Sequence, residues 1–115
     1  MDAEVNFMGW RSRTLTQPEA EIEKYLVRKI KDINGLCWKF TSPGTKGVPD
    51  RIVVVNGMTI FVELKRPLGG RIDPTQAYRV QQIRERGGTA YFINNKNQIK
   101  QLVKHLKDGQ LPDEL

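Results

Sequence analysis

The dipeptide Asn56-Gly57 constrains this chain more than any other feature, because it joins two strand-like runs through a two-residue turn. Both central positions of the favoured hairpin turn need a positive φ, which asparagine and glycine adopt readily. The flanking runs at 51–55 and 58–65 are rich in β-branched and aliphatic residues. A two-residue turn places Val55 opposite Met58, and this single pairing sets the register of the whole hairpin.

The register brings three charged residues to one place. It sets Asp50 opposite Glu63, with Cβ atoms about 4.5 to 5.5 Å apart. Because side chains alternate along a strand, Lys65 lies on the same face as Glu63, one step along at roughly 7 Å. Glu63 and Lys65 alone could form a surface charge ladder. A merely structural hairpin avoids the like-charged pair of Asp50 and Glu63, so the placement favours a chemical role.

A divalent cation is the natural partner for two adjacent carboxylates, since it removes their mutual repulsion. Mg²⁺ takes hard oxygen ligands and usually only one or two protein carboxylates, which leaves positions for water and a substrate phosphate. Asp50 and Glu63 meet that minimum, and Lys65 can hold or polarise an attacking water. The reaction that suits these groups is hydrolysis of a phosphodiester bond.

The remaining periodicities predict one α/β domain. Apolar residues recur at helical spacing over 18–34, and strand-like runs follow at 36–41 and 89–93. Asp73 is the expected N-cap of a second helix ending near Arg86, and Asn95 caps a last helix that ends near Lys107. The predicted order αβββαβα describes an α/β sandwich with a mixed central sheet of about four strands. Residues 1–15 form an N-terminal arm, 16–107 the domain and 108–115 a polar C-terminal tail.

Composition points to a polyanionic partner. Lysine and arginine number 19 against 13 acidic residues, and the formal net charge is +6. No apolar run approaches the roughly 20 residues that span a bilayer, and the N-terminus lacks the apolar stretch of a signal peptide. We therefore expect a soluble, cytoplasmic protein without a membrane partner. The single cysteine, Cys37, excludes an internal disulfide and a multi-cysteine metal site.

The hairpin and its surroundings resemble a nuclease signature. Pro49-Asp50, followed by Glu63-Leu64-Lys65, is similar to the PD-(D/E)xK motif. The wider stretch GVPDRIVVVNGMTIFVELKRPLGGRIDPTQ resembles the VRR-NUC family of virus-type replication and repair nucleases, and the likeness extends over roughly 18–103. The resemblance implies a restriction-endonuclease-like fold and a DNA endonuclease that depends on Mg²⁺ or Mn²⁺.

The resemblance also implies roles for individual residues. The metal-binding groups of the family match Asp50, Glu63 and the backbone carbonyl of Leu64, and the lysine that serves the attacking water matches Lys65. The glutamine that follows the motif matches Gln76, on the helix face that turns toward the sheet. Three positions later, where the family often has an aromatic residue, this chain has Arg79.

The family has one further glutamate on the first helix that reaches the metal, and two residues could fill that place. Glu19 lies three residues before Ile22 on the core-facing side of the helix, which points it toward the sheet. It could instead complete a capping box with Thr16, in which its side chain bonds back to the helix cap. Glu23, one turn later, is the alternative ligand.

Basic residues near the motif suit a DNA backbone. The candidates for phosphate contacts, which position a duplex without reading its sequence, are Lys46, Arg51, Arg66 and Arg71. Free-standing members of the family are associated with homodimers that cut branched DNA such as Holliday junctions. The resemblance thus implies a homodimer acting in phage or bacterial recombination and repair, within the bacterial host cell if phage-encoded. The alternative is a basic nucleic-acid-binding module with the same fold and no turnover.

Overall fold

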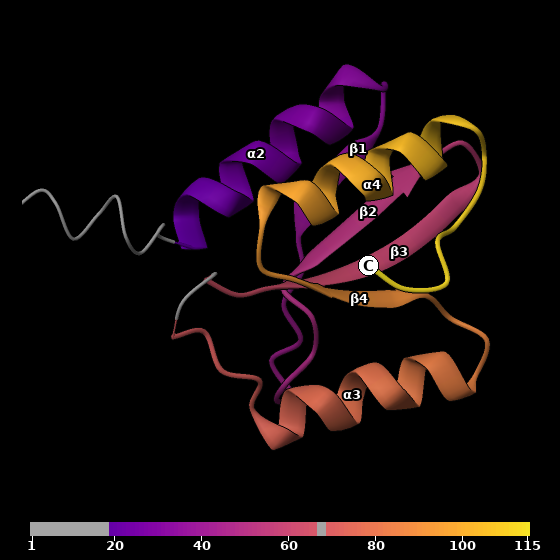
Figure 1. The fold of residues 1–115 in the computed structure, drawn as a ribbon. Helices are drawn as coiled ribbons and strands as arrows, with labels where there is room; N and C mark the ends of the chain where they lie inside the picture. Colours follow the sequence, from indigo (N-terminus) through magenta and orange to yellow (C-terminus); the bar gives the residue numbers. More distant parts are fainter. Residues whose placement is uncertain (1–18, 67–68) are drawn as a thin grey trace, which may run out of the picture.

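A computed structural model describes residues 19–66 and 69–115. Their elements are α2 (Glu19–Asp32), β1 (Leu36–Lys39), β2 (Arg51–Val55), β3 (Met58–Leu64), α3 (Pro74–Glu85), β4 (Ala90–Ile93) and α4 (Lys96–Lys107) (Figure 1). The predicted αβββαβα order is confirmed, with small shifts at the ends of the elements. The arm predicted for residues 1–15 and the capping box predicted from Thr16 lie outside the described residues.

The four strands form one mixed sheet in the order β1-β2-β3-β4. β1 pairs with β2, and β2 with β3, in antiparallel fashion, whereas β4 runs parallel to β3. A parallel neighbour requires a crossover connection, which here contains α3. β3 is therefore an inner strand with partners on both sides, while β1 and β4 are the edges of the sheet.

The register of the β2-β3 hairpin follows from its turn. Asn56 and Gly57 have φ values of 50° and 79°. Val55 pairs with Met58 as predicted. Nδ2 of Asn56 also donates a hydrogen bond to the carbonyl of Leu106 at 2.8 Å. The turn thus determines the register and ties the tip of the hairpin to the end of α4.

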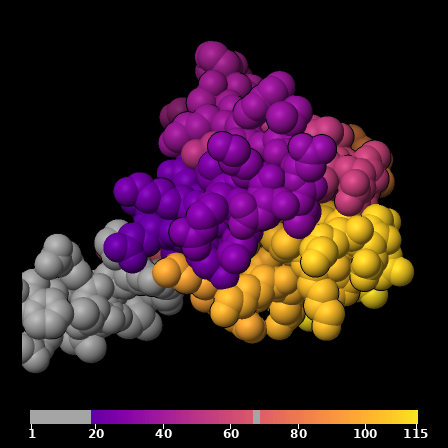
Figure 2. Space-filling model, turned by 90° about the horizontal axis from the view of Figure 1, so that it is seen from above, coloured from indigo at the N-terminus to yellow at the C-terminus, as the bar shows by residue number. Residues whose placement is uncertain are grey.

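The apolar core lies between the sheet and the helices α2 and α4, which lie side by side over one face of the sheet (Figure 2). Its fully buried aliphatic residues include Ile22, Leu26 and Ile30 of α2, Ile99, Leu102 and Leu106 of α4, and Val53, Ile60, Val62, Leu64 and Ile93 of the sheet. On β2 and β3 these positions alternate, so one face of the hairpin belongs to the core. The other face carries Glu63, Phe61 and Thr59 together with Ile52 and Val54, and α3 packs there mainly against β4.

Side-chain caps begin α3 and α4 where the sequence predicts. The carboxylate of Asp73 accepts a hydrogen bond from the N–H of Thr75 at 2.7 Å, and the side chain of Gln76 accepts one from the N–H of Asp73 at 3.3 Å. Asn95 accepts one from the N–H of Gln98 at 2.8 Å. Within 19–66 and 69–115, no helix is both long enough and apolar enough to cross a membrane.

The segment 108–115 differs from the predicted polar tail, because it folds back onto the domain. The hydroxyl of Tyr91 donates to the carbonyl of Pro112 at 2.5 Å. Nε2 of Gln98 donates to the carbonyl of Leu115 at 3.4 Å, and the side chain of Leu115 packs against the core. The composition of the segment did not predict these contacts, because the segment is polar overall and the contacts involve its few apolar residues.

Gly57→Ala is expected to destabilise the fold by about 1 to 2 kcal/mol, because alanine is strained at positive φ. Gly44→Ala is the matched control, since an added Cβ meets nothing within 4 Å at either position and only Gly57 has a positive φ. Urea denaturation followed by circular dichroism measures both variants, and Gly44→Ala should leave the midpoint unchanged or slightly raised. Equal losses in the two variants would show that strain in the turn is not the cause.

Candidate active site

The open end of the β2-β3 hairpin brings Asp50 and Glu63 together. The backbone carbonyl of Asp50 accepts a hydrogen bond from the N–H of Phe40 at 2.9 Å, so strand pairing continues to this residue. Its Oδ1 accepts a hydrogen bond from the N–H of Leu64, the residue after Glu63, at 3.4 Å. Both carboxylates thus lie at the same end of the hairpin, as the register predicts, and on the face opposite to α2 and α4.

Glu63 is the one buried charged residue of the described part of the chain, with a relative exposure of 4%. Its Oε2 accepts a hydrogen bond from Nε2 of Gln76 at 2.8 Å and lies 3.4 Å from Nζ of Lys65. Its other oxygen, Oε1, is buried and has no hydrogen-bond partner among the described residues. A buried acceptor left without a partner costs about 1 to 3 kcal/mol. The structure therefore holds in place a carboxylate oxygen that no residue of 19–66 or 69–115 satisfies.

The pKa values of both carboxyl groups are raised, which is a second sign that their charge is not fully compensated. Burial raises the pKa of Glu63 to about 7, and the charge of Asp50 adds to this rise while Lys65 opposes it. Burial also raises the pKa of Asp50, against the hydrogen bond from the N–H of Leu64. Both groups hold their protons more tightly than they would in water. A cation between them would favour the ionised form of both.

The two candidate glutamates on α2 have different surroundings. Oε2 of Glu23 accepts a hydrogen bond from Nε of Arg51 at 3.0 Å, and it lies 2.8 Å from Nη2 of Arg51 and 3.5 Å from Nζ of Lys39. Two cations therefore already neutralise Glu23. The pKa of Glu19 is raised by partial burial and then by the charge of Asp50. Asp50 is electrostatically coupled to both glutamates, so the difference between them is that Glu23 is already paired with Arg51 and Lys39.

The donor groups at this site fit a hard divalent cation. Carboxylate and carbonyl oxygens are the ligands that Mg²⁺ and Mn²⁺ prefer, and the unsatisfied Oε1 of Glu63 is such an oxygen. No group of three or more His, Cys, Asp or Glu residues that could hold a metal occurs within 19–66 and 69–115. Mg²⁺ usually takes one or two protein carboxylates and keeps several waters, and Asp50 and Glu63 supply that number.

The four basic residues predicted to contact phosphate fall into two groups. Lys46, Arg66 and Arg71 are exposed on the loops that precede and follow the hairpin. The side chain of Arg51 is only 12% exposed, and it also donates to the carbonyl of Cys37 at 3.3 Å. Arg51 follows Asp50 on the strand and so points to the opposite face, toward α2. Arg51 therefore has partners within the domain, and its contact with DNA stays a prediction.

One hydrogen bond near the site is not predicted by any pattern in the sequence. Nε of Arg79 donates a hydrogen bond to the backbone carbonyl of Lys46 at 2.8 Å, which joins α3 to the loop before Asp50. Gly47 lies in the same loop with a φ of 83°, and a Cβ there would approach the methyl group of Thr75 to 2.7 Å. A pairing between a loop carbonyl and a distant helix leaves no local pattern. It explains what Arg79 does where the family often has an aromatic residue.

Comparisons with known proteins bear on the family and the fold of this chain. No family model matches the sequence. Over 50 residues the chain is 54% identical to "Putative nuclease p44" of Acyrthosiphon pisum secondary endosymbiont phage 1. That match covers 43% of this chain and 54% of the phage protein, so the chain spans about half the length of this relative.

A solved structure, "VRR_NUC domain", has the same fold. The TM-score is 0.71 and the sequence identity 28%, and the match covers 76% of this chain and 95% of that domain. The shared portion therefore takes in almost the whole of the compared domain. The resemblance to the VRR-NUC family is confirmed, and this chain folds as a VRR-NUC domain.

Proposed function

We propose that this protein is a Mg²⁺- or Mn²⁺-dependent endonuclease that hydrolyses phosphodiester bonds in DNA. The observation that supports this most directly is the buried Oε1 of Glu63, which has no partner within the described chain and lies at the Asp50 end of the hairpin. A structural role does not account for it, since an apolar residue of similar volume often stabilises such a position better than an ion. The similarity to a phage nuclease and to a VRR_NUC domain supports the same chemistry.

The metal would be held by Asp50, Glu63 and the backbone carbonyl of Leu64, with Glu19 reaching the site from the start of α2. When bound, the cation supplies Lewis acidity and a template for the phosphate and the water. The protein's own contribution is to hold two carboxyl groups at one point, where a cation would favour the ionised form of both. The apolar layer beneath β3 and the hydrogen bonds described above hold them there.

Lys65 is placed to serve the attacking water. Its Nζ lies 3.4 Å from Oε2 of Glu63, and its side chain is 17% exposed, so the ammonium group stays at the carboxylates and still faces the substrate. From this position it can hold a water for in-line attack and stabilise the charge that develops on the phosphate. Oε2 of Glu63, which also accepts the hydrogen bond from Gln76, limits the positions that the ammonium group of Lys65 can take. This gives the lysine a defined position before substrate binds.

Gln76 acts on Glu63 from the first turn of α3. Its Nε2 donates to Oε2 of Glu63 at 2.8 Å, while its Oε1 accepts from the N–H of Asp73 at 3.3 Å. The hydrogen bond to Asp73 determines which end of the amide faces the carboxylate. Gln76 is therefore a positioning residue, which leaves Oε1 of Glu63 as the free ligand.

The substrate we propose is DNA, and branched DNA in particular, cut by a homodimer in phage or bacterial recombination and repair. The formal net charge of +6 and the exposed Lys46, Arg66 and Arg71 support a polyanionic substrate. Such backbone contacts read the shape of DNA and not its sequence. A two-fold dimer would place two cuts symmetrically about a branch point. The site of action would be the cytoplasm of a bacterial host.

A second candidate function is a basic nucleic-acid-binding module without turnover. The ion pair between Lys65 and Glu63 favours this reading, because the cluster could then be a salt-bridge network that only stabilises the fold. Nucleic-acid binding by such a module would be salt-dependent but independent of divalent metal. Metal dependence therefore separates the two functions.

The protein should cut branched, flapped or linear duplex DNA in Mg²⁺ or Mn²⁺ and stop in EDTA. Asp50→Ala and Lys65→Ala should each slow cleavage by about 100-fold or more, as removal of a group that stabilises the transition state does. Lys100→Ala is the matched control for Lys65, because it removes an exposed lysine from α4. Denaturing gels of end-labelled DNA measure the rates. Cleavage that survives Asp50→Ala and Lys65→Ala, or an inactive wild type in both metals, would contradict the proposal.

Without metal, the protein should lose stability as the pH rises. The pKa of Glu63 is about 7 in the folded protein against an ordinary value of 4.5. Between these values the folded state keeps a proton that the unfolded chain has lost, so the free energy of unfolding falls from about pH 4.5 to about pH 7 and then levels off. Glu63→Gln removes the charge and should stabilise the metal-free protein at about pH 8 by roughly 1 to 3 kcal/mol.

Urea denaturation in EDTA over this pH range measures the effect. The gain from Glu63→Gln should disappear at about pH 4, where the wild-type carboxyl is protonated. Adding Mn²⁺ at about pH 8 should then stabilise the wild type and not the variant, since only the wild type has the ligand. A variant with the pH profile and the metal response of the wild type would rule out the assigned role of Glu63.

Gln76→Ala should slow cleavage more than Asp73→Ala does. Both substitutions break the capping box of α3, and each should cost about 0.5 to 2 kcal/mol of stability. Only Gln76 also contacts Glu63, so only its loss frees the carboxylate to turn. Initial cleavage rates, measured where both variants are fully folded, make the comparison. Equal rates for the two variants would mean that Gln76 matters only as a helix cap.

A further inference from the structure

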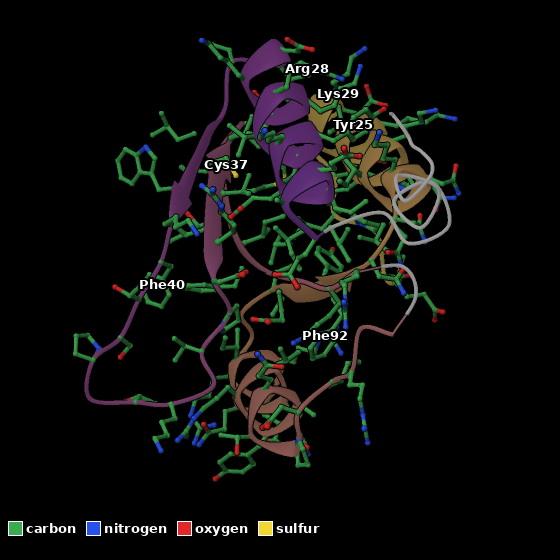
Figure 3. All side chains as sticks on the ribbon, turned by 90° about the vertical axis from the view of Figure 1, so that its left-hand side faces the viewer. Tyr25, Arg28, Lys29, Cys37, Phe40 and Phe92 are labelled. Atoms are coloured by element: carbon green, nitrogen blue, oxygen red, sulfur yellow. The ribbon has the colours of Figure 1, made fainter. Side chains whose placement is uncertain are left out.

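One part of the sheet beside the carboxylates has no helix over it. α2 and α4 lie on one side of the sheet, and α3 packs on the other side mainly against β4 (Figures 1 and 3). On that second side no described helix covers β1 and β2. Trp38 on the edge strand β1 is 60% exposed and Leu36 is 47% exposed. Large apolar side chains gathered on an open sheet edge mark a binding surface.

Trp38 shares its face of the sheet with the carboxylates. It pairs with Ile52 of β2, and the hydrogen bond from Phe40 to the carbonyl of Asp50 continues the same register. Since side chains alternate, Trp38 and Phe40 project on the face of Asp50. Asp50 is then a diagonal neighbour of Trp38, about 7 to 8 Å away along the backbone.

Two further aromatic rings join Trp38 to the site. The rings of Phe40 and Phe61 meet edge to face, with centroids 5.4 Å apart and an interplanar angle of 65°. Figure 3 shows Phe40 where β1 ends and the loop to β2 begins. Phe61 lies two positions before Glu63 on β3 and so on the same face. Trp38, Phe40 and Phe61, here named the aromatic strip, thus lead from the edge of the sheet to the carboxylates.

We propose that the aromatic strip binds a nucleobase that lies outside the duplex stack, by stacking on the exposed indole of Trp38. The proposal rests on the proposed nuclease function and names its substrate class, a nucleic acid with an unpaired or displaced nucleotide beside the cut. In a nucleotide one sugar separates the base from its phosphate. A phosphate at Asp50 therefore leaves its base within reach of Trp38. Bases inside an intact duplex are already stacked and cannot present a free face to the indole.

Charge favours a nucleic acid over a second copy of this chain as the occupant. Lys46 is exposed on the loop that joins Phe40 to Asp50 and supplies a cation on that side of the site. The formal net charge of +6 attracts the phosphates of a nucleic acid to this side of the protein. Aromatic rings for base stacking beside cations for the backbone are the pattern of surfaces that bind single-stranded nucleic acid.

Tryptophan fluorescence tests the proposal, because Trp10→Phe leaves Trp38 as the single tryptophan. The measurements are made with Lys65→Ala in the background, so that the DNA stays intact. A duplex with a single-stranded flap should quench the emission of Trp38, and a perfect duplex of equal length should not. Trp38→Ala should weaken binding of the flapped DNA about 5- to 100-fold and leave binding of the perfect duplex unchanged, as loss of a stacked base predicts.

Leu36→Ala is the matched control, because it removes an exposed apolar side chain from the same face of β1 without removing a ring. It should leave both affinities unchanged, while Trp38→Phe should keep part of the preference for the flap. Equal weakening of both DNAs by Trp38→Ala, or emission that the flap does not quench, would overturn the proposal. So would a change from dimer to monomer in sedimentation velocity with unchanged DNA affinities, which would identify the aromatic strip as a protein interface.

The same variants distinguish this proposal from the nuclease function. A wild type that binds flapped DNA through Trp38 but cuts no substrate in Mg²⁺ or Mn²⁺ would overturn the nuclease function and support stacking. If the wild type cuts DNA in these metals, and Trp38→Ala has the same preference among substrates as the wild type, only the stacking proposal is overturned.

Discussion

The positive φ angles at Asn56 and Gly57 are the constraint on which the rest of the molecule depends. They allow a two-residue turn, and the turn fixes which residue of β2 faces which residue of β3. A slip of one residue would move the buried valines of β2 to the open face and would separate Asp50 from Glu63. The core and the candidate site therefore share one determinant. Selection for a well-packed core also keeps the carboxylates in register.

The candidate site lowers the stability of the fold that contains it. A buried glutamate with an unpaired oxygen and a pKa of about 7 opposes folding near neutral pH. The structure offsets this cost on the other side of the same strand, where Val62 and Leu64 are fully packed against the core. An inner strand whose one face packs against the core can hold a buried carboxylate rigidly on its other face. This arrangement fits a site in which preorganised charge does the chemical work.

Much of the fold could be predicted from the sequence because its signals are local. The hairpin, the caps at Asp73 and Asn95 and the periodicity of α2 each depend on a few neighbouring residues. The pairing of Arg51 with Glu23 was missed, although strand alternation already turned Arg51 away from Asp50. The contacts of Arg79 with the loop and of Tyr91 with Pro112 join distant segments and leave no periodic trace. What the sequence could not decide was thus tertiary, including the choice between Glu19 and Glu23.

The contacts of the candidate site join residues that are closer in the sequence than those paired between β3 and β4. The hairpin closes a short loop and can form early, but β4 reaches β3 only after the chain through α3 has closed on itself. Gln76 stands 13 residues after Glu63, at the start of α3, so its hydrogen bond to the carboxylate does not require β4 to be in place. The groups of the site can therefore meet before the longer loop that brings β4 to the edge of the sheet has closed.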